Sequence, residues 1–120
     1  MQDFQRLVVW RKAHALALNV DRIARRFPRQ GYGPLKSQLT RAADSIATNI
    51  VEGCGAATQK EFARFLDIAI KSTCEAQYHL ISSHDRGVLP DRDWQTLTDD
   101  AIQIRRMLHA LRKQVLADLS

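Results

Sequence analysis

The side chains in this sequence best suited to binding chemistry are arginines in its first half. Residues 1–50 contain nine Lys or Arg against three Asp, whereas residues 51–120 contain nine against ten acidic residues. Arginine presents a planar fork of N–H donors that matches phosphate oxygens, and a one-sided basic surface is typical of nucleic-acid binding. A solvated helix face is the alternative meaning of such a pattern. The candidate nucleic-acid-binding residues are Arg11, Lys12, Arg22, Arg25, Arg26, Arg29 and Arg41.

A second polar pattern lies within residues 38–52, where Gln38, Arg41, Ser45, Thr48 and Glu52 recur three or four positions apart and Asn49 borders an apolar stripe. Such a stripe could face a partner molecule. The interpretation we favour is a hydrogen-bonded seam between two helices, because buried polar groups are usually paired. The predicted seam consists of Asn49, Glu52, Arg64, Ser72 and Glu75.

The residues that usually carry catalysis or bind metals are scattered. The four histidines form neither an H-E-x-x-H motif nor the Glu-x-x-His pairs of di-iron bundles. Neither a phosphate-cradling glycine loop nor a G-x-S-x-G elbow is present. Cys54 and Cys74 lack a C-x-x-C partner and are predicted to be buried small hydrophobes; a reactive Cys54 is disfavoured because no base lies near it in the sequence. We therefore expect no catalytic, cofactor-binding or metal-binding residues.

Four segments show the apolar periodicity of amphipathic helices, and local signals mark their ends. The first runs from Leu7 to Phe27 and stops before Pro28. The second begins at Pro34 and is closed by Gly53 and Gly55, and the third follows a Thr58 capping box and extends to Asp85, with Gly87 as its C-terminal glycine. The fourth follows a predicted cap at Asp91 and continues to Val115.

These helices predict the fold class. Helices of this length joined by short turns pack as antiparallel neighbours, so we expect an all-α, up-down-up-down four-helix bundle forming one domain over residues 1–120. No apolar run approaches the roughly 20 residues that span a bilayer. The N-terminus lacks the basic flank and apolar core of a signal peptide, so the expected location is the cytoplasm.

Two segments carry more apolar surface than one bundle requires. In the third helix a second apolar face lies about a quarter turn from the main stripe, and the start of the first helix is bulky. Contiguous apolar surface usually marks an interface, so we predict a homo-oligomer. The alternative is that the third helix is central and buried on two sides. The predicted interface residues are Phe4, Leu7, Trp10, Ile70, Cys74 and Ile81.

With these features in place, the chain resembles the four-helix-bundle proteins encoded in 23S ribosomal RNA intervening sequences, which are related to the accessory variability determinant of diversity-generating retroelements. Residues 38–53 are similar to the family signature Q-x-x-R-A-x-x-S-I-x-x-N-I-x-E-G at every anchored position. The chain departs from the family pattern at Lys71, where a glycine is usual, and at Ala56-Ala57, where an arginine is usual.

The resemblance implies a homopentamer around a central pore. For the retroelement relatives it also implies a basic barrel that binds nucleic acid and a reverse transcriptase. Together with the arginine pattern, it leads us to expect a non-enzymatic, cytoplasmic, oligomeric bundle that binds RNA or DNA without sequence preference. The alternative is a protein-interaction scaffold whose positive charge, +5 in total, serves only solubility.

Overall fold

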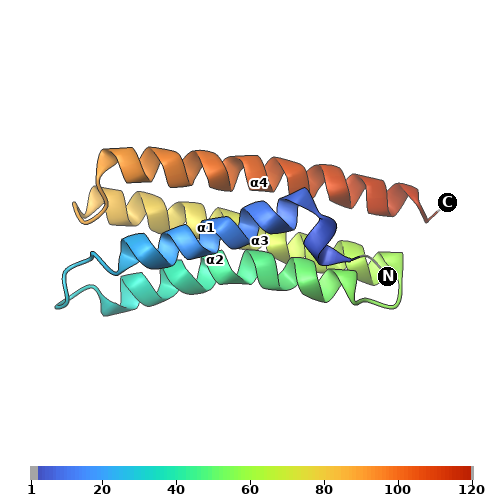
Figure 1. The fold of residues 1–120 in the computed structure, drawn as a ribbon, viewed down its shortest axis with the longest axis horizontal. Helices are drawn as coiled ribbons and strands as arrows, with labels where there is room; N and C mark the ends of the chain where they lie inside the picture. The colour runs from blue at the N-terminus through green and yellow to red at the C-terminus, as the bar shows by residue number, and fades with distance from the viewer. Residues whose placement is uncertain (1–2, 120) are drawn as a thin grey trace.

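The computed structural model describes residues 3–119, so residues 1, 2 and 120 of the predicted domain lie outside the described residues. After a short 3-10 helix, η1 (Phe4–Arg6), four α-helices follow: α1 (Val8–Ala24), α2 (Gly33–Cys54), α3 (Gln59–Asp85) and α4 (Asp91–Ala117). They run alternately up and down in a bundle measuring 51 × 20 × 20 Å (Figure 1). The predicted all-α, up-down-up-down four-helix bundle is confirmed.

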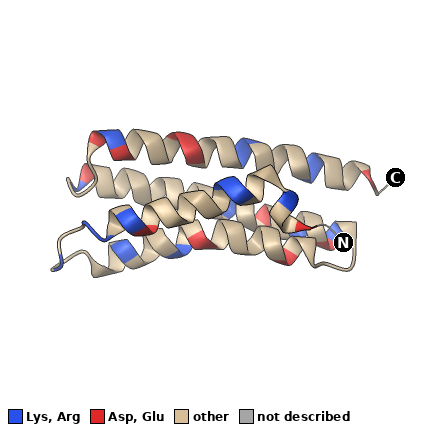
Figure 2. Ribbon diagram, viewed as in Figure 1, with Lys and Arg blue, Asp and Glu red and all other residues tan. Residues whose placement is uncertain are grey.

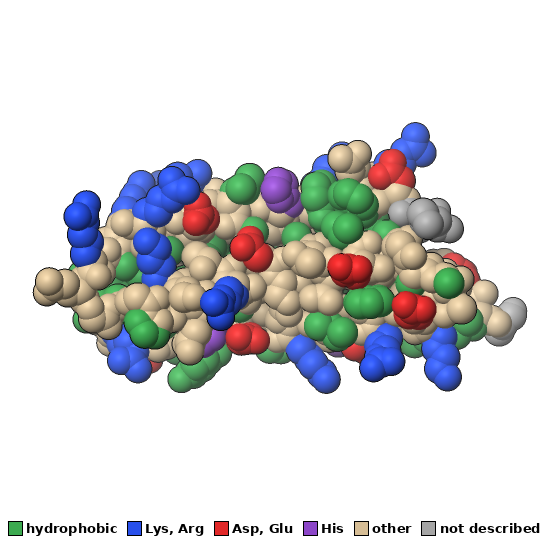
Figure 3. All heavy atoms as spheres, turned by 90° about the horizontal axis from the view of Figure 1, so that it is seen from below, with side chains coloured by type: hydrophobic (Ala, Val, Ile, Leu, Met, Phe, Trp, Pro, Cys, Tyr) green, Lys and Arg blue, Asp and Glu red, His purple; other side chains and the backbone are tan. Residues whose placement is uncertain are grey.

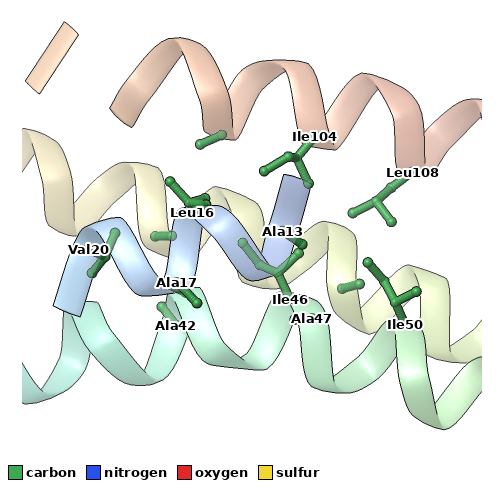
Figure 4. Packing of buried hydrophobic residues seen from close by; sticks show 14 of the residues in the cluster. Ala13, Leu16, Ala17, Val20, Ala42, Ile46, Ala47, Ile50, Ile104 and Leu108 are labelled. Atoms are coloured by element: carbon green, nitrogen blue, oxygen red, sulfur yellow. The ribbon is translucent and has the colours of Figure 1, made fainter. Parts of the chain in front are cut away.

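The core is a single apolar cluster that draws on every α-helix. The apolar stripes predicted from periodicity face inward, and the most enclosed side chains, such as Leu16, Ile46, Leu66 and Leu108, are at most 1% exposed. In the middle of the bundle, alanines on α1 and α2 let those helices approach each other, while isoleucine and leucine fill the space toward α4 (Figure 4). Burial of these side chains is the main force that holds the bundle together.

Two of the predicted helix ends are confirmed at the level of single hydrogen bonds. Thr58 caps α3, because its hydroxyl accepts a bond from the Glu61 N–H at 3.1 Å. At the other end of α3, Gly87 has a φ of +81°, and the N–H groups of Gly87 and Val88 donate to the carbonyls of His84 and Ser83. This is a Schellman motif, which favours glycine at its left-handed position.

Three other predicted helix ends differ from the structure. α1 ends at Ala24, three residues before Phe27, because the chain tightens into 3-10 hydrogen bonds ahead of Pro28. Asp91 is the first residue of α4 and not its cap, a position that Pro90 occupies. Gly53 lies inside α2, so only Gly55 follows the helix, and its φ of −87° is one that any residue adopts.

The N-terminal residues that we predicted as an oligomer interface pack in part against their own bundle, and their contact with a second copy stays a prediction. Phe4, Leu7 and Trp10 are half-buried against the core, and the Phe4 ring meets the Trp10 ring edge-on at 4.9 Å. The turn of η1 folds this segment back, which is why its bulk is not left free. On α3, Ile70 is likewise half-buried against the core, whereas Cys74 and Ile81 are exposed. The alternative interpretation, that α3 is covered on two sides within one chain, therefore holds for part of its second apolar face.

The helices of the bundle are amphipathic and interrupted by charge. Within residues 3–119, no helix combines the length and apolar character of a membrane-crossing segment.

Candidate nucleic-acid interface

The up-down topology brings the α1–α2 and α3–α4 connections to the same end of the bundle. Residues 21–36 and 85–93, which form that end, contain seven Lys or Arg and four Asp. The segments at the opposite end, 3–7, 52–64 and 112–118, contain five basic and four acidic residues. The end with the α1–α2 connection, at the left of Figure 2, therefore has a net charge of +3 (7 − 4), against +1 (5 − 4) at the opposite end. Figure 3 shows further basic side chains along the rest of the bundle. We call the set Arg22, Arg25, Arg26, Arg29, Lys36, Arg86 and Arg92 the basic end.

Four predicted arginines dominate this end, and all four are exposed. Arg25 forms an ion pair with Asp21 at 2.8 Å, and Arg22 donates to the side-chain oxygen of Asn19 at 2.9 Å. Arg26 and Arg29 form neither a side-chain hydrogen bond nor an ion pair within residues 3–119. Exposed pairs contribute little energy, so a phosphate could replace these partners at small cost.

The other predicted arginines and lysine lie elsewhere. Arg11 is exposed near the start of α1, and Arg41 is exposed on α2 about a turn beyond the basic end. Lys12 borders the groove between α1 and α4 together with Asp100. Partial burial raises the pKa of the Asp100 carboxyl, while the positive charge of Lys12 opposes that rise. The structure thus separates Lys12 from the arginine cluster and gives it a local electrostatic partner.

Sequence reasoning missed Arg86 and Arg92, which α3 and α4 bring to the basic end. They lie outside the basic half of the sequence, and only the topology places them beside residues 22–29. His84 stabilises the α3–α4 turn through two contacts. Its Nε2 lies 2.5 Å from a carboxylate oxygen of Asp91, and its ring stacks on the Trp94 ring with centroids 4.1 Å apart. These contacts connect the end of α3 to the start of α4 next to Arg86 and Arg92.

A polar seam does join α2 to α3. Its central residue, Ser45, belongs to the predicted polar stripe but not to the five residues predicted to make up the seam. The Ser45 and Ser72 hydroxyls lie 2.8 Å apart, and the Ser72 hydroxyl donates to the Ile68 carbonyl. The Asn49 amide donates to the Ser45 carbonyl at 2.8 Å and to the Ser45 hydroxyl at 3.0 Å. Since each hydroxyl has one proton, the donors run from Asn49 to Ser45, from Ser45 to Ser72, and from Ser72 to Ile68.

The three charged residues predicted for the seam do not join it. Glu52, Arg64 and Glu75 are exposed, and within residues 3–119 none is bonded to Asn49 or Ser72. Glu75 lies near His79, with 3.7 Å between its carboxylate oxygen and the imidazole Nε2. At this point α2 and α3 meet through the small side chains of Ser45 and Ser72, so a long charged side chain does not fit between the two helices.

Replacing Asn49 by alanine should destabilise the bundle by about 1 kcal/mol, because it removes a donor to Ser45 from a partly buried network. Urea unfolding at fixed protein concentration measures this change. The affinity of folded protein for nucleic acid should not change, since Asn49 lies in the second half of α2, away from the basic end.

Thr48→Ala is the matched control for this prediction. Thr48 is exposed, and its hydroxyl bonds only to the Asp44 carbonyl of its own helix, so its loss should alter the free energy of unfolding by less than about 0.5 kcal/mol. Equal effects of the two substitutions would show that the seam adds no stability.

The two cysteines differ in their surroundings. Cys54 is buried as predicted, and desolvation by burial, with the nearby Asp3 carboxylate, raises the pKa of its thiol. Cys74 is exposed, so the prediction that both cysteines are buried is wrong for Cys74. In the part of the chain that the structure describes, no group of three or more His, Cys, Asp or Glu side chains is arranged to hold a metal ion.

Two comparisons with known proteins, one with family models and one with solved structures, agree with each other. Residues 5–110 match the family model of the 23S rRNA-intervening sequence protein. Among solved structures, a protein of unknown function of the S23 ribosomal protein family from Bacteroides thetaiotaomicron has a similar fold, with a TM-score of 0.83 and 22% sequence identity. The alignment covers 88% of this chain and 99% of that one. No curated protein sequence matches the chain.

Proposed function

The chain belongs to the family of 23S rRNA-intervening sequence proteins, and we propose that it is a non-enzymatic, homo-oligomeric bundle that binds nucleic acid through its basic end. The proposal includes a cytoplasmic location, where RNA and DNA are accessible. Binding would depend on phosphate charge and not on base sequence, because no recognition helix or stacking motif was identified in the sequence.

The observation that carries the proposal is the clustering of Arg22, Arg25, Arg26 and Arg29 on the surface at one end of the bundle, with Asp21 as their only carboxylate ion-pair partner within residues 3–119. Phosphate groups offer charge-assisted, bidentate bonds to such side chains. An oligomer would present several basic ends to one strand, which raises the effective concentration of contacts and so the affinity.

Self-association is supported by apolar side chains that the bundle leaves outside. Ile68 and Ile81 on α3 are 39% and 38% exposed, and Cys74 lies exposed between them in the sequence. An open groove of about 720 Å³ crosses the first half of α3 and reaches the end of α4 at Leu116. We propose a pentamer, the assembly that the family resemblance implies.

The exposed apolar residues of α3 also favour a second candidate function, a scaffold that binds a partner protein; a reverse transcriptase is the partner that the retroelement relatives suggest. Contacts of that kind are apolar and respond little to salt. Phosphate binding weakens steeply with salt because counterions are released on association. Salt dependence therefore discriminates between the two functions.

We expect the purified protein to scatter light as an oligomer and to take up a short RNA or duplex DNA at roughly 50 mM salt. At roughly 200 mM salt the affinity should fall by tenfold or more, because several phosphates are contacted. Light scattering gives the mass of the complex, and fluorescence anisotropy of a labelled oligonucleotide gives its affinity.

An oligomer that is indifferent to both nucleic acids at low salt would exclude the nucleic-acid function and favour the protein scaffold. A monomer at all concentrations would instead exclude the proposed assembly.

A further inference from the structure

A groove beside the basic end combines aromatic and basic side chains. It lies between the start of α2 and the end of α3, has a volume of about 250 Å³, and contains Tyr32, Gln38, Tyr78, His79, Ser82 and Arg86 in its lining. Gly31 also lines it, two residues after Arg29, so the groove opens next to the arginine-rich connection.

Tyr78 is the unusual residue of this groove. It is 61% exposed, the largest exposed fraction among the large hydrophobic residues in the described part of the chain. An exposed aromatic ring at a charged site is a platform on which a base can stack, and such stacking is the usual way in which single strands are bound without sequence reading. Because the ring faces solvent, burial in the core does not explain why an aromatic residue lies at this position.

The other side chains of the groove are held in place. Arg86 donates from Nε to the Ser82 hydroxyl at 3.0 Å, which fixes the base of its guanidinium group, while its outer nitrogens donate to no side chain within residues 3–119. His79 is 9% exposed and packs beside Tyr78, with ring centroids 5.4 Å apart. The carboxylate oxygen of Glu75 lies 3.7 Å from its Nε2, beyond hydrogen-bond distance.

The size of the groove limits its occupant. A volume of about 250 Å³ lies below the roughly 300–1,000 Å³ of sites that enclose drug-sized ligands, which suits a single planar base better than a whole nucleotide. The bases of a duplex are stacked and paired, so only an unpaired base can enter.

We propose that this groove binds one unpaired nucleotide of a single-stranded nucleic acid, with the base on the Tyr78 ring and the adjoining phosphate on Arg86. The inference rests on the proposed function, to which it adds a preference for single strands. The neighbouring phosphates would continue onto the basic end.

The test compares the affinity of a labelled single strand and of a duplex of equal length for the parent protein and three variants. Tyr78→Ala should weaken single-strand binding about tenfold, the loss of one stacked base, and should leave duplex binding within twofold. Tyr78→Phe keeps the ring and should bind both like the parent. Leu18→Ala is the matched control, because Leu18 is an apolar residue of α1 that is 58% exposed and belongs to neither the basic end nor the predicted oligomer interface; this variant should also bind both like the parent.

A direct readout is photo-crosslinking with a single strand that contains 5-iodouracil. The crosslinked peptide should contain Tyr78, and crosslinking should fall when Arg86 is changed to alanine. Circular dichroism confirms that each variant is folded, which the exposure of these side chains leads us to expect.

The outcomes distinguish a failure of the proposed function from a failure of the groove assignment. If the parent protein binds neither strand nor duplex, the proposed function fails, and this site fails with it. If the parent binds but Tyr78→Ala weakens both ligands equally or neither, the basic end binds nucleic acid and the groove does not. A crosslink at another residue, or protection of Tyr78 by a neighbouring subunit, would also overturn the groove assignment.

Discussion

Replacing Gly53 by valine should destabilise the bundle by about 3 kcal/mol, because the position has no room for a side chain. A Cβ atom there would lie 2.8 Å from Cδ1 of Phe62 and 3.2 Å from Cβ of Phe65. Phe62 is only 5% exposed, so its ring cannot swing away without opening the core. Thermal unfolding followed by circular dichroism at fixed concentration should show a midpoint lowered by roughly 10 °C.

A graded series separates this steric effect from helix propensity. Gly53→Ala gains up to about 1 kcal/mol of propensity but meets the same Phe62 contact, so we expect a smaller net loss. Gly55→Ala is the matched control, since a Cβ there would lie no closer than 3.6 Å to any neighbour and the backbone conformation is ordinary. An unchanged midpoint for Gly53→Val would show that α2 and α3 separate easily at this point.

Gly53 also shows where sequence reasoning reaches its limit. A glycine near the end of an apolar stripe predicts a terminator, since glycine commonly ends helices. The structure makes it a contact residue inside α2, which the ring of Phe62 requires to be small. Nothing in a single sequence distinguishes these meanings, because the distinction depends on which residue of α3 lies opposite.

The prediction of the polar seam fails in part for the same reason. Helical periodicity gives the angle of each residue around its own helix, and it correctly brings Ser72 to the α2–α3 contact. Asn49 reaches that contact only through Ser45 of its own helix. It does not give the axial offset between two helices, so it cannot identify Ser45 as the partner of Ser72. The same periodicity therefore predicts Glu52, Arg64 and Glu75 in a seam that they do not join.

The fold and the location of positive charge are more predictable. Four periodic segments with short connections predict an up-down bundle, and Arg22, Arg25, Arg26 and Arg29 are identified from the uneven charge and from their positions off or just beyond the apolar stripe of the first helix. Arg86 could have been added from the sequence, since an up-down bundle must place its first and third connections at one end. The exposure of Tyr78 could not have been predicted from the sequence, because it depends on which side of α3 the neighbouring helices cover.

Changing Arg22, Arg25 and Arg26 together to glutamate should reduce nucleic-acid affinity at roughly 50 mM salt by about a hundredfold. The logarithm of affinity should also become less dependent on the logarithm of salt concentration, by about 0.9 for each phosphate that the variant no longer neutralises. All three side chains are exposed, so the core is untouched. Glutamate at the end of α1 opposes the helix dipole, which costs about 0.3–1 kcal/mol for each residue in the last turn and leaves the fold intact.

The control must change net charge equally at the other end of the bundle. Lys60, Arg64 and Lys113 are exposed near the α2–α3 connection and the end of α4, and their reversal to glutamate lowers net charge by the same amount. Because Lys60 and Arg64 line the groove that supports self-association, light scattering must show that this variant assembles like the parent. If affinity depended only on net charge, the two triple variants would lose it equally. A loss confined to the Arg22, Arg25 and Arg26 variant would instead locate the phosphate contacts at the basic end, because screening at the Debye length of about 10 Å in 0.1 M salt isolates charges at opposite ends of a 51 Å bundle.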